Sequence, residues 1–248
     1  ASKIARDRAV DFQKPVPISS LEWTASELTA RLISAETSIE GRKFKANGKL
    51  SEAEKEYIRE KTNSLVKAPI YIDDNPGLTI FELRAKCRRL KQKYDIQMVF
   101  IDYLQLMQGG DAVKSGNREQ EISYISRQLK ALSKELSIPI LALSQLSRAV
   151  ETRGGSKKPV LSDLRESGAI EQDADIVMFI YRPAYYGEGG EDDERLAKVI
   201  IAKHRAGETG EADLNFINQY VRFENRMDDI GYNSFDSTLV ESKMNYEE

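Results

Sequence analysis

The chain alternates short, strongly apolar runs with longer stretches in which apolar residues recur every three or four positions. Six runs are predicted to be strands: 16–21, 70–72, 97–103, 139–144, 176–181 and 198–202. Several of them, such as MVFIDYL, IPILALS and DIVMFIY, are almost continuously apolar, which is typical of strands covered on both faces. A final pair of segments, ADLNFI and YVRFEN, flanks an Asn-Gln turn and predicts an antiparallel hairpin at a sheet edge.

Amphipathic segments separate these strands. Residues 78–94 and 117–136 carry apolar side chains at helical spacing, and residues 24–35 begin with Thr24 and Glu27, a capping-box pattern. Residues 1–12 have helical spacing without a capping residue, so we expect them to finish an element that begins before residue 1. Strands that alternate with helices predict an α/β fold, with a mainly parallel sheet flanked by helices and a C-terminal β-hairpin.

Composition adds few constraints beyond the exclusion of several protein classes. The 248 residues are 40% hydrophobic and 31% charged, which is typical of a globular domain and not of a disordered or fibrous chain. No apolar run approaches the length of a membrane span, and the single cysteine excludes an internal disulfide. These features predict a soluble protein of a reducing, intracellular compartment with no membrane partner. Residues 227–248 contain six acidic residues and one lysine, so we expect an acidic, disordered tail.

Polar side chains follow several of the predicted strands. Glu22, Asp102 and Gln145 come directly after three apolar runs, and Lys203 and Arg205 follow a fourth. Each alone has an ordinary explanation as a cap or a solvated strand end. Because ligands of open parallel sheets bind beyond the carboxyl ends of the strands, we expect the five residues to converge on one edge. Two carboxylates, an amide and two cations suit phosphoryl transfer assisted by magnesium.

Several longer motifs then resemble one family. The segments SSLE, VFIDYLQLM, GNREQEIS, ALSQLSRAVE, IIAKHR and DLRESGAIEQDAD are similar to the carboxy-terminal RecA-like domain of DnaB-type bacterial replicative helicases, over roughly residues 3–226. The last segment is the most specific. The resemblance implies a RecA-like P-loop NTPase core at residues 1–226, ATP and Mg²⁺ as cofactors, and single-stranded DNA as substrate. It also implies a homo-oligomeric ring, expected to be a hexamer, with primase and a helicase loader as partners in the bacterial cytoplasm.

The resemblance also implies roles for individual residues. Glu22 matches the catalytic glutamate that activates the attacking water, and Asp102 matches the Walker B aspartate that holds magnesium through its water shell. Gln145 matches the glutamine that senses the γ-phosphate. Arg31 matches an arginine near the nucleotide phosphates, although a helix-surface cation is an equal alternative.

Of three more motif positions, two concern the neighbouring subunit and one departs from the family pattern. Lys203 and Arg205 match a pair that reaches the active site of an adjacent subunit, with Arg205 as the arginine finger. The family normally has methionine after the catalytic glutamate, whereas this chain has Trp23. We expect this change to alter packing only.

A DNA contact is expected near the motif DLRESG. Residues 147–165 contain five basic and two acidic residues, a local positive excess in a chain that is otherwise nearly neutral. Arg165, Glu166 and Gly168 match the family's loop contacts to the single-strand backbone. An arginine and exposed backbone N–H groups suit phosphate binding without base readout, and no aromatic residues are interleaved for stacking.

The Walker A motif GxxxxGK[ST] does not occur in these 248 residues, so we expect the first strand and phosphate loop of the family to lie upstream of residue 1. The sequence GK at 48–49 has the wrong glycine spacing and lacks the Ser or Thr. Two alternatives to a helicase motor stay open at this point. One is a binding or assembly subunit that lacks the phosphate loop, and the other is a recombinase ATPase of the RecA or RadA type.

Overall fold

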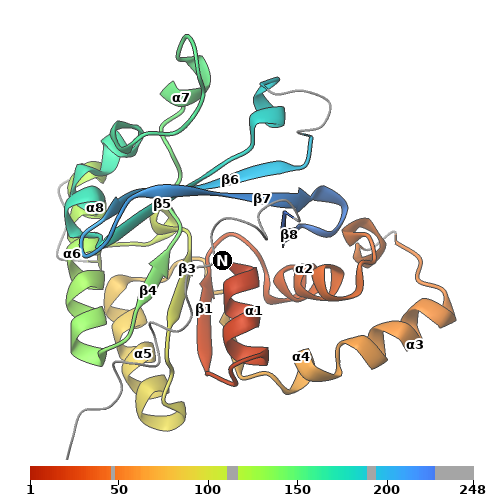
Figure 1. The fold of residues 1–248 in the computed structure, drawn as a ribbon. Coiled ribbons are helices and arrows are strands. Elements are labelled where there is room, and N and C mark those ends of the chain that lie inside the picture. Colours follow the sequence, from red (N-terminus) through yellow and green to blue (C-terminus); the bar gives the residue numbers. More distant parts are fainter. Residues whose placement is uncertain (46–47, 111–116, 189–193, 227–248) are drawn as a thin grey trace, which may run out of the picture.

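The structure, a computed structural model, describes residues 1–45, 48–110, 117–188 and 194–226 (Figure 1). The predicted acidic tail, 227–248, lies outside the described residues. Five longer helices form the bulk of the helical structure: α1 (Ser2–Val10), α2 (Ala25–Thr37), α3 (Glu52–Lys61), α5 (Ile80–Tyr94) and α6 (Arg118–Leu136). Three short ones accompany them: α4 (Asn63–Lys67), α7 (Ala149–Thr152) and α8 (Gly168–Asp173).

In the described part of the chain, eight strands form two sheets. The first is parallel, in the order β2-β1-β3-β4: β2 (Ile70–Asp73), β1 (Val16–Ser20), β3 (Val99–Asp102) and β4 (Ile140–Ala142). The second is antiparallel, in the order β5-β6-β7-β8: β5 (Ile176–Tyr181), β6 (Leu196–His204), β7 (Gly210–Ile217) and β8 (Arg222–Asn225). The mixed α/β fold with a parallel sheet flanked by helices is thus confirmed, and so is the C-terminal hairpin.

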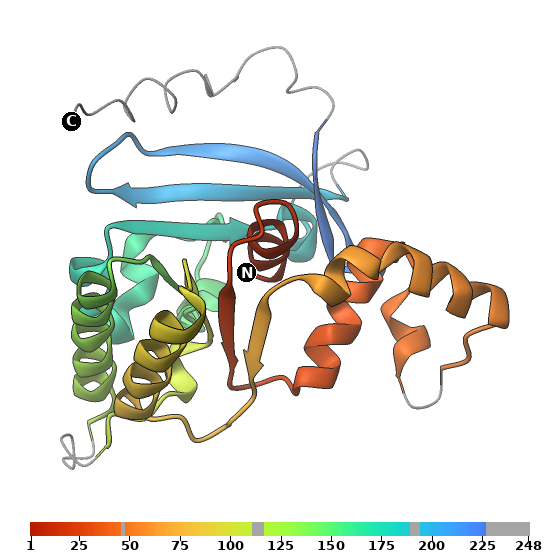
Figure 2. The ribbon, with the colours of Figure 1, turned by 90° about the horizontal axis from the view of Figure 1, so that it is seen from below.

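Helices cover both faces of the parallel sheet, and β3 shows why. Its side chains alternate: Val99 and Ile101 pack with α5 and α6, whereas Phe100 packs with α1, α2 and β1 on the other face. All three are at most 1% exposed. Figures 1 and 2 show α5 and α6 on one side of the sheet and α1 and α2 on the other. A strand buried on both faces requires apolar residues at every position, as the sequence pattern of this run indicates.

The prediction that the fifth and sixth runs belong to the parallel sheet is wrong. Ile176 pairs with His204 and Tyr181 pairs with Lys198, so β5 and β6 run in opposite directions. A parallel pair needs a crossover connection, usually a helix. Among the described residues between these strands, only a short 3₁₀ turn at Pro183–Tyr186 is present. An apolar run does not encode the direction of its neighbour, so the sequence pattern could not separate the two sheets.

The strand β5 also departs from the pattern expected of a strand covered on both faces. Val177, Phe179 and Tyr181 are buried against the second sheet's own core, whereas the alternating Ile176, Met178 and Ile180 are about half exposed. In the described part of the chain, β5 has one covered face and one open face.

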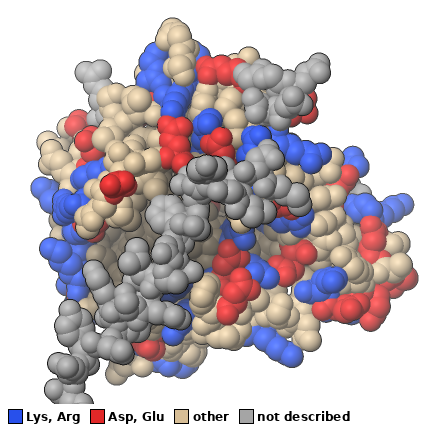
Figure 3. Space-filling model, viewed as in Figure 1, with Lys and Arg blue, Asp and Glu red and all other residues tan. Residues whose placement is uncertain are grey.

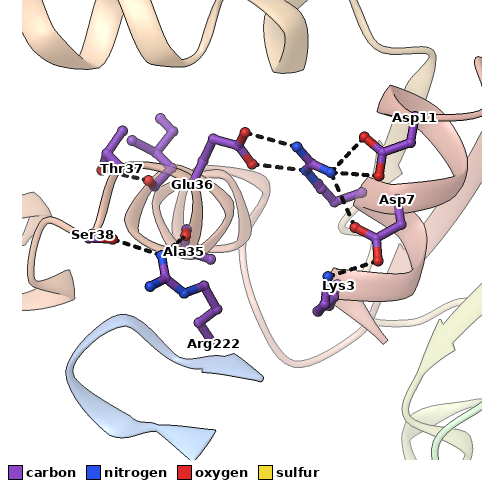
Figure 4. A network of polar contacts seen from close by, with 10 residues as sticks. Lys3, Asp7, Asp11, Ala35, Glu36, Thr37, Ser38 and Arg222 are labelled. Atoms are coloured by element: carbon purple, nitrogen blue, oxygen red, sulfur yellow. Dashed lines mark hydrogen bonds and ion pairs between the residues drawn. The ribbon is translucent and has the colours of Figure 1, made fainter. Parts of the chain in front are cut away.

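Two arginines, one on α1 and one on β8, hold the carboxyl end of α2 (Figure 4). From α1, Arg6 donates to both carboxylate oxygens of Glu36 at 2.9 Å each. From β8, Arg222 donates to the carbonyl oxygen of Ala35 at 3.0 Å and to the Ser38 hydroxyl at 2.7 Å. A cation at the carboxyl end of a helix satisfies its last carbonyls and complements the helix dipole. These contacts fix α2, whose amino end reaches the edge of the parallel sheet.

The lone cysteine gives a test of the core. Cys87 on α5 is 1% exposed, and burial together with the nearby Asp73 charge raises the pKa of its thiol to about 12. Because the thiolate is the reactive form, we expect the folded chain to react with Ellman's reagent far more slowly than the urea-unfolded chain at pH 8. Free glutathione provides the reference rate. Equal rates for the folded and unfolded chain would mean that α5 does not pack as described.

Candidate active site

Two carboxylates meet where β1 and β3 end. Ser20 is the register partner of Asp102, and the backbone N–H of Leu21 donates to the carbonyl oxygen of Asp102 at 2.7 Å. Glu22 follows directly on the same side of the sheet and is exposed, whereas Asp102 is half-buried. The parallel pairing therefore brings together two acidic residues that are separated by 80 positions in the sequence.

The charges at this edge act on one another. Burial, and then the neighbouring Glu22 carboxylate, raise the pKa of Asp102 above its ordinary value. The positive charge of Arg31 opposes that rise. Arg31 therefore lies close enough to this edge to stabilise the ionised form of Asp102. A half-buried acid between another acid and a cation is the kind of electrostatic cluster that occurs at functional sites.

A side-chain hydrogen bond within the turn after β1 stabilises that turn. The Ser20 hydroxyl, in a residue that is 1% exposed, donates to the carbonyl oxygen of Trp23 at 2.6 Å. Thr24 and Glu27 then form the predicted capping box at the start of α2, with the Thr24 N–H donating to Glu27 at 3.0 Å. Arg31 lies two turns into α2, and its guanidinium carbon is 3.7 Å from the centre of the Trp23 ring. The packing that Trp23 alters thus includes a candidate site residue.

The backbone of Gln145 is held beside the same edge by the side chain of Gln105, which is not one of the predicted site residues. The side chain of Gln105 accepts from the Gln145 backbone N–H at 3.1 Å and donates to its carbonyl oxygen at 3.3 Å. It also donates to the Ser144 hydroxyl at 2.9 Å. Gln105 thus clamps both backbone groups of Gln145, three residues beyond the end of β4, to the segment that follows β3.

Arg118 fixes the other side of this clamp. Its guanidinium donates to the carbonyl oxygens of Gln105 and Met107 at 2.8 and 3.0 Å, and it forms an ion pair with Glu121. Both Gln105 and Arg118 stand in motifs that carry the family resemblance, DYLQLM and GNREQE. Their motif positions gave a signal, but their partners are distant in sequence and only the fold shows them.

The structure does not bring Lys203 and Arg205 to this edge. Lys203 lies within β6 and donates to the carbonyl oxygen of Glu171, and Arg205 contacts Asp175 and the carbonyl oxygen of Gln172. In Figure 1, β6 ends beside α8, away from the ends of β1 and β3. The prediction that all five strand-end residues converge is wrong for these two, because β6 belongs to the antiparallel sheet.

The expected DNA segment, 147–165, is partly neutralised by one carboxylate of its own and by one on β7. Arg153 contacts both oxygens of the buried Asp163 at 2.9 and 3.2 Å, and Lys158 forms an ion pair with Glu211. A side chain added at Gly168 would meet nothing within 4 Å, so its backbone borders open space. The side chains of Arg165 and Glu166 lie outside what the structure describes. Figure 3 shows basic and acidic side chains interspersed on the visible face, with acidic groups gathered near α3.

Known proteins of one family match nearly the whole chain. The family model of the DnaB-like helicase C-terminal domain matches residues 1–225. The replicative DNA helicase DnaC of Bacillus subtilis is 46% identical over 234 residues, which cover 93% of this chain and 51% of that protein. The replicative DNA helicase DnaB of Geobacillus stearothermophilus is 47% identical over 225 residues, which cover 91% and 49%.

Solved structures show the same fold. A DnaB-like replicative helicase, whose structure was described with its interactions with primase, matches with a TM-score of 0.83 and 37% identity. That match covers 91% of this chain and 54% of that one. A second structure, described as an ATPase domain, matches with a TM-score of 0.83 and 39% identity, over 91% of this chain and 78% of that one.

The parallel sheet and the helices on both of its faces define a mixed α/β domain, and the matches identify its family. The chain belongs to the family of DnaB-like helicase C-terminal domains. It spans about half the length of the curated relatives that it matches. No helix in the described part of the chain is long and apolar enough to cross a membrane.

The Gln105 clamp gives a direct test of the site's geometry. In Gln105→Ala, the N–H of Gln145 loses its acceptor, so we expect its amide to exchange with deuterium faster than in the unchanged chain. The free energy of unfolding should fall by about 0.5–1.5 kcal/mol, the usual net worth of one hydrogen-bonding group. Gln92→Ala, on the exposed side of α5, is the matched control. Unchanged exchange at Gln145 would show that the clamp does not hold this residue in solution.

Proposed function

We propose that this chain is the motor domain of a replicative DNA helicase, which hydrolyses ATP and moves along single-stranded DNA as a ring in the bacterial cytoplasm. The single observation that carries the proposal is the meeting of Glu22 and Asp102 at the carboxyl edge of β1 and β3. The family membership and the names of the relatives support it, and they favour it over a recombinase or a non-catalytic subunit.

The acidic residues fit a magnesium ion that is shared with a nucleotide. Among the described residues, no three His, Cys, Asp or Glu side chains gather so as to hold a metal ion by themselves. Magnesium commonly binds one or two carboxylates and takes its other ligands from water and substrate phosphates. Asp102, half-buried beside Glu22, offers that donor set. The ion would neutralise phosphate charge during the transfer.

The protein's own groups divide the remaining work. Glu22 is exposed at the edge, so its carboxylate can accept a proton from an attacking water. Arg31 would place positive charge on the phosphates, and Gln145 would donate an amide N–H to the terminal phosphate. The Gln105 clamp would keep the backbone of Gln145 in place as the phosphate is lost.

Lys203 and Arg205 would act on a neighbouring copy. Lys203 lies in β6 and Arg205 directly follows that strand, where both contact residues of α8. The Arg205 side chain is 55% exposed. A ring of copies would present this surface to the next subunit's nucleotide. An arginine supplied in this way stabilises charge that develops in the transition state.

Single-stranded DNA would bind at the segment around Arg165, Glu166 and Gly168. The open space beside Gly168 leaves its backbone accessible to a phosphate group. The hydrogen bond from Ser147 N–H to the Asp163 carbonyl oxygen, at 3.0 Å, links this segment to the residues that follow Gln145. Nucleotide state could thus reach the DNA contact through a short, connected stretch of the chain. Primase and a helicase loader would bind elsewhere on the ring.

The division between the two acids can be tested in the chain fused behind a segment that carries GxxxxGK[ST], which we call the loop-completed protein. Glu22→Gln should retain nucleotide binding while ATP turnover falls by roughly 10²-fold, the scale of a lost general base. Asp102→Asn should also weaken magnesium-dependent binding. Steady-state ATPase assays and titration with a fluorescent ATP analogue measure both effects. If both variants lost only turnover, these roles would be assigned wrongly.

The DNA assignment has a different readout. Arg165→Ala should weaken binding of single-stranded DNA about equally for all sequences, and the slope of log K against log salt should fall by about one. The reason is that a cation on a phosphate releases counterions and reads no base. Fluorescence anisotropy over a salt series measures this, with the exposed Arg59→Ala on α3 as the control. A loss confined to one sequence would indicate base readout instead.

The role of Arg205 in trans can be tested by mixing variants. Arg205→Ala should bind ATP but turn it over roughly 10³–10⁵-fold more slowly, as expected for a lost arginine finger. Mixed rings of Arg205→Ala and Glu22→Gln subunits contain some interfaces with both groups intact, so they should regain part of the activity.

The control for this experiment is Asp175→Asn, which breaks the ion pair of Arg205 but keeps the cation. It should leave most of the ATPase activity in place. If no mixing ratio exceeds the two parents despite demonstrated subunit exchange, Arg205 acts within its own subunit or only supports the structure.

A further inference from the structure

The only tryptophan of the chain stands next to the candidate general base. Trp23 follows Glu22 directly, at a position where the resemblance to the family implies methionine. Among the described aromatic pairs, none includes the Trp23 ring. The ring instead contacts a cation: the guanidinium carbon of Arg31 lies 3.7 Å from the ring centre. The six described cation–π contacts range from 3.7 to 5.8 Å, and this one is the shortest.

The stacked pair is held at both ends. On one side, the Ser20 hydroxyl fixes the Trp23 carbonyl at 2.6 Å. On the other side, Arg31 extends from α2, a helix whose amino end carries a capping box and whose carboxyl end is tied to α1 and β8. The ring and the guanidinium therefore meet between two anchored segments, and their contact fixes where the cation lies.

The contact with the Trp23 ring leaves the N–H donors of the Arg31 guanidinium available for hydrogen bonds. An arginine that lies over a ring uses its face, so its N–H donors, which point outward in the plane, stay free for oxygen acceptors. In the described part of the chain Arg31 forms no ion pair, although its charge acts on both Asp102 and Glu27. Among the described residues, Arg31 thus contacts the Trp23 ring and forms no salt bridge with Asp102.

We propose that Trp23 is a positioning residue, whose indole face holds the Arg31 guanidinium beside Asp102 and Glu22 with its N–H donors free for phosphate oxygens. This inference rests on the proposed function, because the phosphates are those of the nucleotide. It adds a specific task to a residue that the family pattern does not use in this way. Trp23 does not touch the reacting atoms and acts only through Arg31.

The stack itself can be measured in the 248-residue chain without any nucleotide. Trp23 is the sole indole fluorophore, so its quenching by acrylamide reports how much of the ring is covered. Arg31→Ala uncovers one face, and we expect the quenching constant to rise, whereas Arg31→Lys should give a smaller rise. Tyr57→Leu, which removes an exposed aromatic partner of Lys61, is the control and should change nothing. Equal quenching in the unchanged chain and in Arg31→Ala would overturn the inference.

The functional half is tested by ATPase kinetics in the loop-completed protein. Trp23→Leu should raise KM for ATP by roughly 2- to 30-fold, the range expected when a cation–π contact is lost, while kcat changes little. Trp23→Phe keeps an aromatic face and should restore most of the difference. In an Arg31→Ala background, Trp23→Leu should have no further effect, because the ring acts through that arginine.

Three results would overturn this half of the inference: an unchanged KM in Trp23→Leu, equal behaviour of Trp23→Phe and Trp23→Leu, or a further loss in the Arg31→Ala background. A loop-completed protein with no ATPase activity would instead refute the proposed function, and the phosphate role of Arg31 with it. The quenching experiment separates the two cases, since it does not depend on hydrolysis.

Discussion

The strand β3 is the constraint on which the rest of this structure depends. Val99, Phe100 and Ile101 are buried on both faces, so α5 and α6 must cover one side of the sheet and α1 and α2 the other. The first polar residue of β3 is Asp102, at the end of the strand, where helices no longer cover both faces. Parallel pairing with β1 and β4 then places their own ends at the same level. The position of the acidic edge is thus a consequence of how the core is covered.

Hydrogen bonds at the strand ends turn this edge into an ordered site. One side chain, Gln105, holds both backbone groups of Gln145, and Arg118 in turn holds the carbonyl of Gln105. The Ser20 hydroxyl fixes the turn that carries Glu22 and Trp23. The side chains of Gln105, Arg118 and Ser20 would carry out no chemical step themselves. They restrict the loops that follow the strands, which would otherwise be the most mobile parts of such a site.

The sequence and the structure disagree most in the carboxy-terminal half. The apolar runs at β5 and β6 were recognisable as strands, but their direction depends on the partner that each finds, and that is a tertiary property. This is why Lys203 and Arg205 were placed at the wrong edge. The helix α3 was missed for another reason: it buries no residue, so it lacks the apolar periodicity on which the prediction relied. Its Ser51–Glu54 capping box was the available signal.

The sequence by itself determined the strands of the parallel sheet, the capped start of α2, the family, and the acidic pair Glu22 and Asp102, because apolar periodicity, caps and motifs are local properties. Tertiary structure alone decided that the last four strands form a separate sheet, and that Arg205 lies away from Glu22. It alone showed that Gln105 clamps Gln145 and that Trp23 stacks on Arg31. The physical reason is that these contacts join side chains whose distance depends on how strands and helices pack, and no local pattern encodes that distance.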